Sequence, residues 1–92
     1  MFQAIAIHHA RPEHAEEFVA FMHRVIEHVG DAPGLIEFTG WREANGSRLF
    51  GFSRWESADA FQAALPRIES MTSERRDEWS EREDEVLLLV PV

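Results

Sequence analysis

The chain has 92 residues, enough for a single domain, which we expect to span residues 1–92. Its 17 acidic and 9 basic residues give a formal net charge of -8, and such a surface repels phosphate backbones and anionic lipids, so neither nucleic acid nor a membrane is expected as partner. The absence of cysteine excludes disulfides and thiolate metal sites, and the N-terminus does not resemble a signal peptide, so a cytoplasmic location is expected.

The first part of the chain predicts a strand and then an amphipathic helix. Residues 2–9 have the composition of a strand. The helix should begin at Arg11-Pro12-Glu13, with proline in the first turn and an acid at the positive end of the helix dipole. Gly30 should end it. Its apolar residues recur with helical spacing: Ala15, Phe18, Val19, Met22, Val25, Ile26 and Val29.

A β-hairpin is predicted over residues 35–55. Asn45-Gly46 separates two β-prone runs, which indicates a two-residue type I′ turn with Ala44 opposite Ser47. This register makes favourable cross-strand pairs on one face: Glu43/Arg48, Trp41/Phe50, Thr39/Phe52 and Glu37/Arg54. The other face carries Arg42/Leu49, Gly40/Gly51, Phe38/Ser53 and Ile36/Trp55.

The last part of the chain predicts a second helix, a charged segment and a final strand. Ser57 is a suitable N-cap, and Pro66 should kink or interrupt the helix that follows. Residues 72–85 are mostly charged, so we expect a short helix that lies over the body of the domain and is anchored by Trp79. Residues 86–90 are all apolar, as in a strand buried on both faces.

This order, βαββαβ, is the ferredoxin-like pattern of the α+β class, with a four-stranded antiparallel sheet and both helices on one face. The other sheet face would be bare, although the first and last strands are apolar on both sides. A soluble monomer rarely exposes so large an apolar surface. We therefore expect a homodimer in which two sheets pack face to face.

Several short motifs in this order are similar to those of a known family. They are Arg11-Pro12-Glu13 leading into Glu17-Phe18, then Pro33-Gly34-Leu35, then Arg54-Trp55-Glu56-Ser57 followed by Ala60-Phe61. Together they resemble the antibiotic biosynthesis monooxygenase family of dimeric α+β barrels, over nearly the whole chain. That family includes cofactor-independent quinol oxygenases of polyketide pathways, haem-degrading enzymes and members without an assigned activity.

The chain departs from the family at positions that carry chemistry. Many members have a histidine late in the second helix, where this chain has Ala64. The haem-degrading branch has an asparagine on the first strand, where this chain has Ile5, and a tryptophan and a histidine in and after the second helix, whereas residues 60–71 contain neither. Haem degradation by that route is therefore not expected, and no cofactor is expected.

The five histidines do not predict a metal site. His8 and His9 lie on opposite faces of a strand, and no pair has the spacing of metal ligands. The family alignment places His9 on the helix-facing side of the first strand with Ile5 and Ile7, where it would be a general base or a solvated rim histidine. Arg42 would hold an oxyanion or pair with a neighbouring acid.

Gly40 beside Gly51 predicts a hollow in the sheet, which would be the floor of a ligand pocket or would let a helix approach closely. Trp55 is expected in the core or in this pocket, and Trp79 is expected to be an anchor or a lid. The predicted lining is Phe18, Met22, Phe38, Gly40, Gly51, Ser53, Trp55, Phe61 and Trp79.

Two functions follow from these features. The first, implied by the resemblance, is a cofactor-independent monooxygenase that acts on a small aromatic quinol through His9 and Arg42. The second is a non-catalytic dimeric module that binds a small molecule or has an accessory role, which the alanine at position 64 favours.

Overall fold

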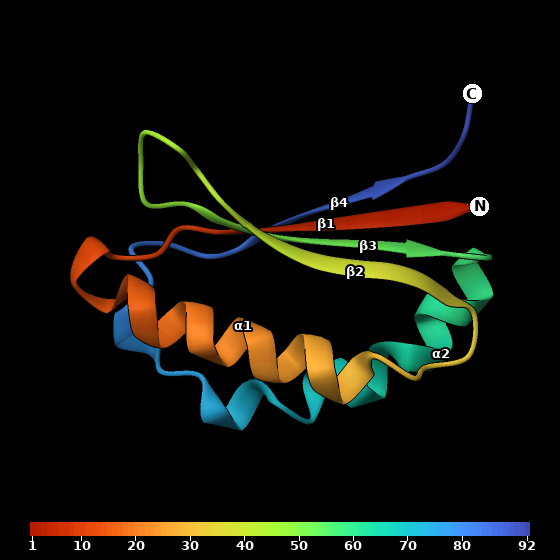
Figure 1. Cartoon of the computed structure of the whole chain (residues 1–92), viewed down its shortest axis with the longest axis horizontal. Coiled ribbons are helices and arrows are strands. Elements are labelled where there is room, and N and C mark those ends of the chain that lie inside the picture. Colours follow the sequence, from red (N-terminus) through yellow and green to blue (C-terminus); the bar gives the residue numbers. More distant parts are fainter.

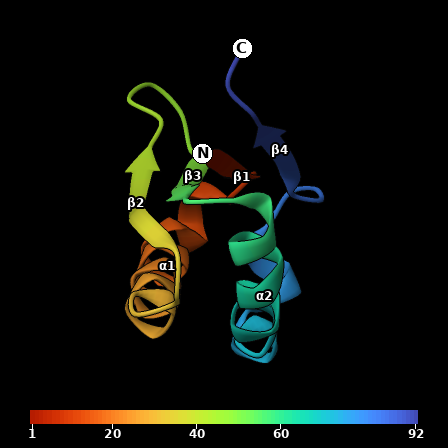
Figure 2. The ribbon, with the colours of Figure 1, turned by 90° about the vertical axis from the view of Figure 1, so that its right-hand side faces the viewer.

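A computed structural model describes all 92 residues. The elements are β1 (Phe2–His8), α1 (Ala15–Val29), β2 (Leu35–Arg42), β3 (Leu49–Trp55), α2 (Ala58–Glu69) and β4 (Glu85–Leu89). The strands form one antiparallel sheet in the order β2-β3-β1-β4, with both helices against one face (Figure 1). Seen from the end, α1 and α2 lie side by side beneath that face (Figure 2). The predicted ferredoxin-like α+β fold is confirmed.

The side of β1 that faces the helices is not the one that the family alignment indicated. Phe2 and Ala4 are buried under the helices, in a core cluster that includes Phe61 of α2. Ile5 belongs to the opposite face, where it lies beside Phe50 and Phe52. Because successive side chains of a strand alternate, an error of one residue moves the whole set to the other face. The prediction that His9 lies on the helix-facing side of β1 is wrong for this reason.

The hairpin has the predicted register along most of its length, including Trp41 opposite Phe50 and Gly40 opposite Gly51. At the far end, a bulge between Leu35 and Glu37 places Leu35 opposite Trp55 and leaves Ile36 exposed. The expected pair of Ile36 with Trp55 is therefore wrong.

The turn of the hairpin is not the predicted type I′ turn. That turn requires positive φ at Asn45 and Gly46, and neither residue has it. Instead the Glu43 carboxylate folds over the loop and accepts hydrogen bonds from Arg48 Nε (3.1 Å) and Nη2 (2.7 Å). A Cβ at Gly46 would meet only the Glu43 side chain, so a larger residue here would push that carboxylate aside.

The helix ends follow the local signals in the sequence. Residues Pro12–His14 form a 3₁₀ turn before α1, and Ser57 caps α2 by accepting a hydrogen bond from the Ala60 N–H (3.1 Å). Helix α2 continues through Pro66 to Glu69, so the expected interruption does not occur. Gly34, between α1 and β2, has a φ of 82°, and a Cβ there would lie 2.6 Å from the Ala60 side chain.

Residues 72–85 form two 3₁₀ turns, Thr72–Glu74 and Asp77–Trp79, rather than the expected helix. The segment does not form a helix because its backbone pairs with the residues that follow β1. Arg11 N–H donates to the Trp79 carbonyl (2.7 Å), and Glu81 N–H donates to the His9 carbonyl (2.8 Å). Trp79 is 5% exposed and packs against Phe18 and Phe21, as an anchor should.

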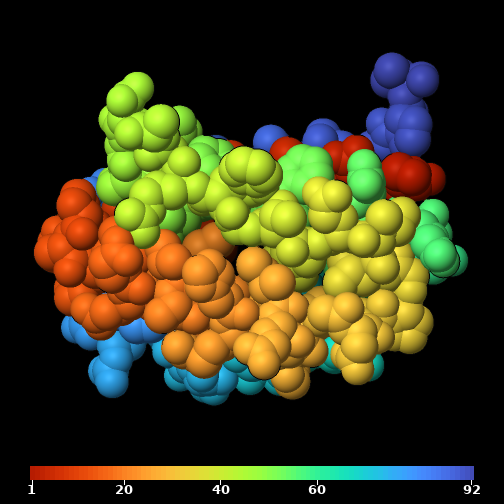
Figure 3. Space-filling view, viewed as in Figure 1, coloured from red at the N-terminus to blue at the C-terminus, as the bar shows by residue number.

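Strand β4 is exposed along its whole length, in contrast to the expectation that it is buried on both faces. It is an edge strand paired only with β1, and the helices do not cover it within one chain. The tip of the hairpin and the C-terminal residues stand above the sheet, on the side away from the helices (Figure 3). The open face of the sheet lies between these two projections.

The interior consists of two separate apolar clusters. One is centred on Trp55 and includes Phe2, Val29 and Phe61. The other is centred on Phe18 and includes Leu49 and Trp79. Val25 is half-buried and packs against both clusters. The space between the two clusters is enclosed by the helices and the sheet.

Candidate functional site

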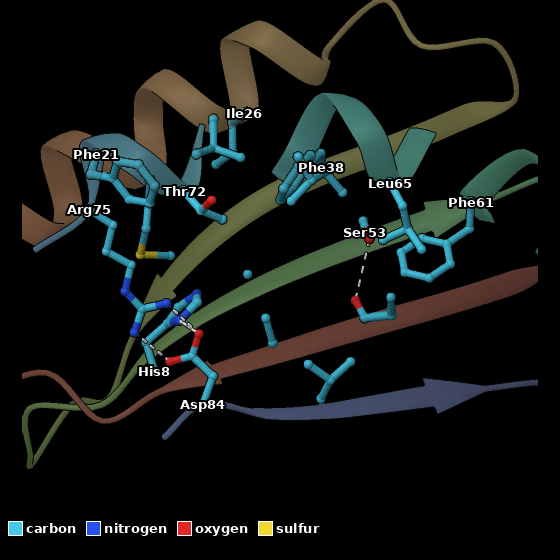
Figure 4. A pocket seen from close by; sticks show the side chains of 17 residues that line it. His8, Phe21, Ile26, Phe38, Ser53, Phe61, Leu65, Thr72, Arg75 and Asp84 are labelled. Carbon is cyan, nitrogen blue, oxygen red and sulfur yellow. Dashed lines mark hydrogen bonds and ion pairs between the residues drawn. The ribbon is translucent and has the colours of Figure 1, made fainter. Parts of the chain in front are cut away.

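A cavity of about 260 Å³ lies between the sheet and the two helices (Figure 4). This helix–sheet cavity is slightly smaller than the range of about 300–1,000 Å³ that is usual for small-molecule sites. Most of its wall is apolar. The lining residues are Ala4, Ala6, His8, Phe21, Met22, Val25, Ile26, Phe38, Gly51, Ser53, Phe61, Leu65, Ile68, Thr72, Arg75, Asp84 and Val86.

The cavity exists because the sheet has small residues at its centre. Ala4 and Ala6 alternate along β1 on the helix-facing side, and Gly51 of β3 is the cross-strand partner of Ala6. These three central positions, Ala4, Ala6 and Gly51, carry no side chain larger than a methyl group. The larger residues that would fill the space, Phe2 and Trp55, belong to the cluster at one end of the sheet.

One end of the cavity is polar, and three charged or ionisable side chains meet there. His8 is at the end of β1, Arg75 lies between the two 3₁₀ turns, and Asp84 immediately precedes β4. Arg75 Nη1 donates to Asp84 Oδ2 (2.5 Å) and Nη2 to Asp84 Oδ1 (2.7 Å). His8 Nδ1 lies 3.0 Å from Asp84 Oδ2, a close ion contact without the alignment of a hydrogen bond.

At this end of the cavity, the charge of the Asp84 carboxylate is balanced by Arg75. Burial raises the pKa of Asp84, but the hydrogen bonds from Arg75 and the contact with His8 outweigh it and hold the pKa well below its usual range. Asp84 is therefore ionised, and Arg75 balances its charge. The other side chains that line the cavity are uncharged.

The structure brings together five of the residues predicted to line a pocket: Met22, Phe38, Gly51, Ser53 and Phe61. Phe18 and Trp55 are fully buried and Trp79 is nearly so, and all three pack in the core behind the cavity wall. Gly40 lies outside the cavity because Met22 and Ile26 of α1 cover it, with their nearest atoms 3.6 and 3.5 Å from the position of a Cβ. The predicted single hollow over both glycines is therefore divided: the helix–sheet cavity extends over Gly51, and Gly40 borders a separate hollow of about 100 Å³.

The two predicted catalytic residues lie outside the cavity. His9 Nε2 is 2.6 Å from Glu85 Oε2 and does not line the cavity, which corrects the expectation that it faces the helices. Arg42 Nη2 donates to Glu16 Oε1 (2.8 Å) at the surface. Of its two expected roles, Arg42 therefore has the pairing with a neighbouring acid.

Sequence reasoning missed the three ionisable residues at the polar end of the cavity. A signal for His8 was available, since it continues the alternation of Phe2, Ala4 and Ala6 by one more step. No such signal existed for Arg75 and Asp84. They lie in a stretch of charged residues that all look solvated, and only the backbone pairing with residues 9–11 brings them to the cavity.

No three side chains of histidine, cysteine, aspartate or glutamate gather closely enough to hold a metal ion. No helix has the length and apolar character needed to cross a membrane.

A four-stranded antiparallel sheet with two helices on one face and a cavity between them defines the class of ferredoxin-like α+β domains. The sequence pattern of antibiotic biosynthesis monooxygenases matches residues 1–66, which is more than half of the chain. The chain belongs to that family. No protein of curated function matches it in sequence.

Solved structures share the fold over almost the whole chain. A Mycobacterium tuberculosis protein, Rv0793, is 22% identical, with a TM-score of 0.86 and coverage of 99% of this chain and 94% of its own. A mutant of SnoaB, a cofactor-independent oxygenase from Streptomyces nogalater, is 18% identical, with a TM-score of 0.76 and coverage of 98% and 91%. A mutant of MhuD with two manganese protoporphyrin IX molecules per active site is 23% identical, with a TM-score of 0.82 and coverage of 100% and 95%.

The cavity does not have the residues that the resemblance assigns to haem degradation. Ile5 faces away from it, and α2 contributes Phe61, Leu65 and Ile68, none of which can bind iron. Ala64, at the position of the family histidine, is 4% exposed and belongs to the core cluster around Trp55. The residues of the cavity therefore do not fit haem degradation by that route.

Proposed function

We propose that the protein is a cofactor-independent monooxygenase that oxygenates a small aromatic quinol in the helix–sheet cavity. The observation that carries this proposal is one imidazole, His8, at the polar end of a cavity that is otherwise apolar, with a carboxylate at its Nδ1 atom. Family membership and the shared fold with SnoaB, a cofactor-independent oxygenase, support this type of reaction.

His8 would act as the general base. A quinol ring packed against the apolar walls brings one hydroxyl group to the free Nε2 atom of His8. The O–H bond breaks, an Nε2–H bond forms, and the quinolate faces an imidazolium whose charge Asp84 offsets. Such a base increases the rate by about 10²–10⁴-fold.

The quinolate is electron-rich enough to react with molecular oxygen directly. The quinol and O₂ give a hydroxyquinone and water, so one oxygen atom enters the ring, the other leaves as water, and the substrate supplies all four electrons. The protein contributes the base and a cavity that keeps water from the anion. This role is consistent with a site that has few polar groups.

The alternative is a module that binds the same kind of ligand without turning it over. Ala64 favours it, because the chain lacks the family histidine and a buried alanine cannot replace it. The two functions agree on the ligand and differ only in whether His8 removes a proton.

Measuring oxygen uptake with naphthalene and anthracene quinols distinguishes the monooxygenase from the binding module. We expect the wild-type protein to consume oxygen faster than buffer, His8→Ala to lose about 10²–10⁴-fold in kcat, and His9→Ala to remain close to wild type, because His9 lies on the other sheet face. Tryptophan fluorescence reports binding in the same samples. Quinol binding without oxygen uptake above the buffer rate would leave only the binding module.

A further inference from the structure

The polar end of the cavity is built by a segment that lies outside the residues that match the family. Arg75, Ser80 and Asp84 all follow residue 66. Besides its two bonds to Asp84, Arg75 Nη2 donates to Ser80 Oγ (2.8 Å). The guanidinium therefore holds the carboxylate in a two-pronged arrangement, which restricts rotation more than a single bond does.

A fully buried aromatic ring aligns the members of this cluster. The Arg75 guanidinium carbon lies 4.7 Å from the centre of the Phe18 ring. The His8 ring packs against the same residue, with ring centres 4.9 Å apart. Phe18 is itself held by Trp79, at 5.7 Å between ring centres. Arg75 and His8 thus share one rigid support, and Asp84 lies between them.

The arrangement has a consequence for the hydrogen on the imidazole ring. Asp84 Oδ2 is shared by Arg75 Nη1 and His8 Nδ1. An ionised carboxylate beside Nδ1 favours the tautomer with hydrogen on that atom, which leaves Nε2 unprotonated. Nδ1 is enclosed and has no other partner. Asp84 and Arg75 are the only charged groups of the cavity that face His8.

We propose that Arg75 is a positioning residue that acts through Asp84: its two-pronged bond fixes the carboxylate so that His8 carries hydrogen on Nδ1 and presents Nε2 to the ligand. This inference rests on the proposed function for the role of Nε2 as proton acceptor. The tautomer itself is a property of the free protein and can be measured without any substrate.

The test is nitrogen NMR of the histidine rings in ¹⁵N-labelled protein, with His8 assigned by comparison with His8→Gln. In the wild-type protein, we expect neutral His8 to be a single Nδ1–H tautomer. In Arg75→Gln, we expect its two ring nitrogen signals to move toward each other as the tautomers mix. Arg75→Lys, which keeps the charge but only one prong, should lie between the two. Arg76→Gln is the matched control, because the Arg76 side chain is 70% exposed and reaches only Glu78, at 4.0 Å.

Kinetics give a second readout if quinol oxygenation is observed. Arg75→Gln should lower kcat by about tenfold or more with little change in KM, and should shift the pH midpoint of kcat, whereas Arg76→Gln should change neither. An Nε2–H tautomer in the wild type, or His8 signals in Arg75→Gln and Arg75→Lys that coincide with those of Arg76→Gln, would overturn the positioning role. Absence of oxygen uptake would count against the proposed function alone, since the tautomer measurement still stands.

Discussion

Gly40 and Gly51 are cross-strand partners with different surroundings. At Gly51 a Cβ would meet only Phe38 and Ala6 at 3.8 and 3.9 Å, which is ordinary contact, and the space beyond is the cavity. At Gly40 the space is already occupied by Met22 and Ile26. The two positions therefore form a matched pair for testing the cavity as a ligand site.

We expect Gly51→Leu to abolish binding of a quinol and to leave the domain folded, because the leucine side chain extends into the cavity. Its cost in unfolding free energy should not exceed about 1–3 kcal/mol, as for an enlarged core residue. Gly40→Ala should bind as the wild type does. Fluorescence titration measures binding, and urea unfolding measures stability. Wild-type affinity in folded Gly51→Leu protein would place the ligand elsewhere.

Because of Asp84, the free energy of unfolding should depend on pH in the acidic range. The lowered pKa of this group means that its pairing with Arg75 contributes fully at pH values above the ordinary aspartate range, near 4, and is lost as the pH falls further. We expect Asp84→Asn to cost about 1–3 kcal/mol at pH 7, because Arg75 loses its partner. This difference from the wild type should shrink below about pH 4.

Urea unfolding between pH 2.5 and 7 checks this expectation, with Asp77→Asn as the control because Asp77 is exposed on the neighbouring 3₁₀ turn. A difference between Asp84→Asn and wild type that stays constant down to pH 2.5 would contradict it.

At the scale of elements, the segment between α2 and β4 forms the polar end of the helix–sheet cavity. It has no helical periodicity, and its position depends on Trp79, on the backbone bonds to residues 9–11 and on Arg75. The Trp79 indole N–H also donates to Glu17 Oε2 of α1 (3.2 Å). Trp79 thus ties the segment to the first helix, together with Arg75, which packs on Phe18, and Glu74, which pairs with Arg24.

Trp79→Ala should destabilise the domain by about 3–5 kcal/mol, as for other large-to-small changes in a core, which is a large part of the stability of a small domain. Trp79→Phe should lose less, since it keeps a ring against Phe18 and Phe21. Urea unfolding followed by circular dichroism measures both variants. A loss below about 1 kcal/mol in Trp79→Ala would show that the segment is held mainly by its backbone bonds.

At the scale of the whole molecule, the face of the sheet away from the helices is apolar and uncovered. Trp41 is 62% exposed, Leu87 47% and Leu89 41%, and Ile5, Phe50 and Phe52 lie between them. Soluble monomers rarely leave a sheet face of this composition uncovered. A second copy packed sheet to sheet would cover it and would bury β4.

We expect the protein to be a dimer in solution, so that light scattering should report about twice the chain mass of 10.6 kDa. Leu87→Glu places a charge on the open face of β4 and should give a folded monomer. Gln62→Glu, an exposed change on α2, should leave the dimer intact. A stable wild-type monomer at micromolar concentration would contradict the expectation.

Local signals were sufficient for most of the fold. The apolar spacing of α1, the Ser57 cap and the cross-strand charge pairs each depend on residues close in the chain, and the structure has all three. The site was harder to predict. Part of the apolar wall of the cavity was predicted from the hairpin register. Its polar end depends on residues 8, 75 and 84, which are far apart in sequence.

The sequence by itself determined the order of elements, the fold class and the small residues that leave a hollow in the sheet, because periodicity, caps and cross-strand pairs act over short distances along the chain. Only the tertiary structure decided which face of β1 meets the helices, since both faces are apolar and a strand pattern cannot distinguish them. It also decided that His8 rather than His9 enters the cavity, because Arg75 and Asp84 reach it only through the folded path of the segment that Trp79 anchors.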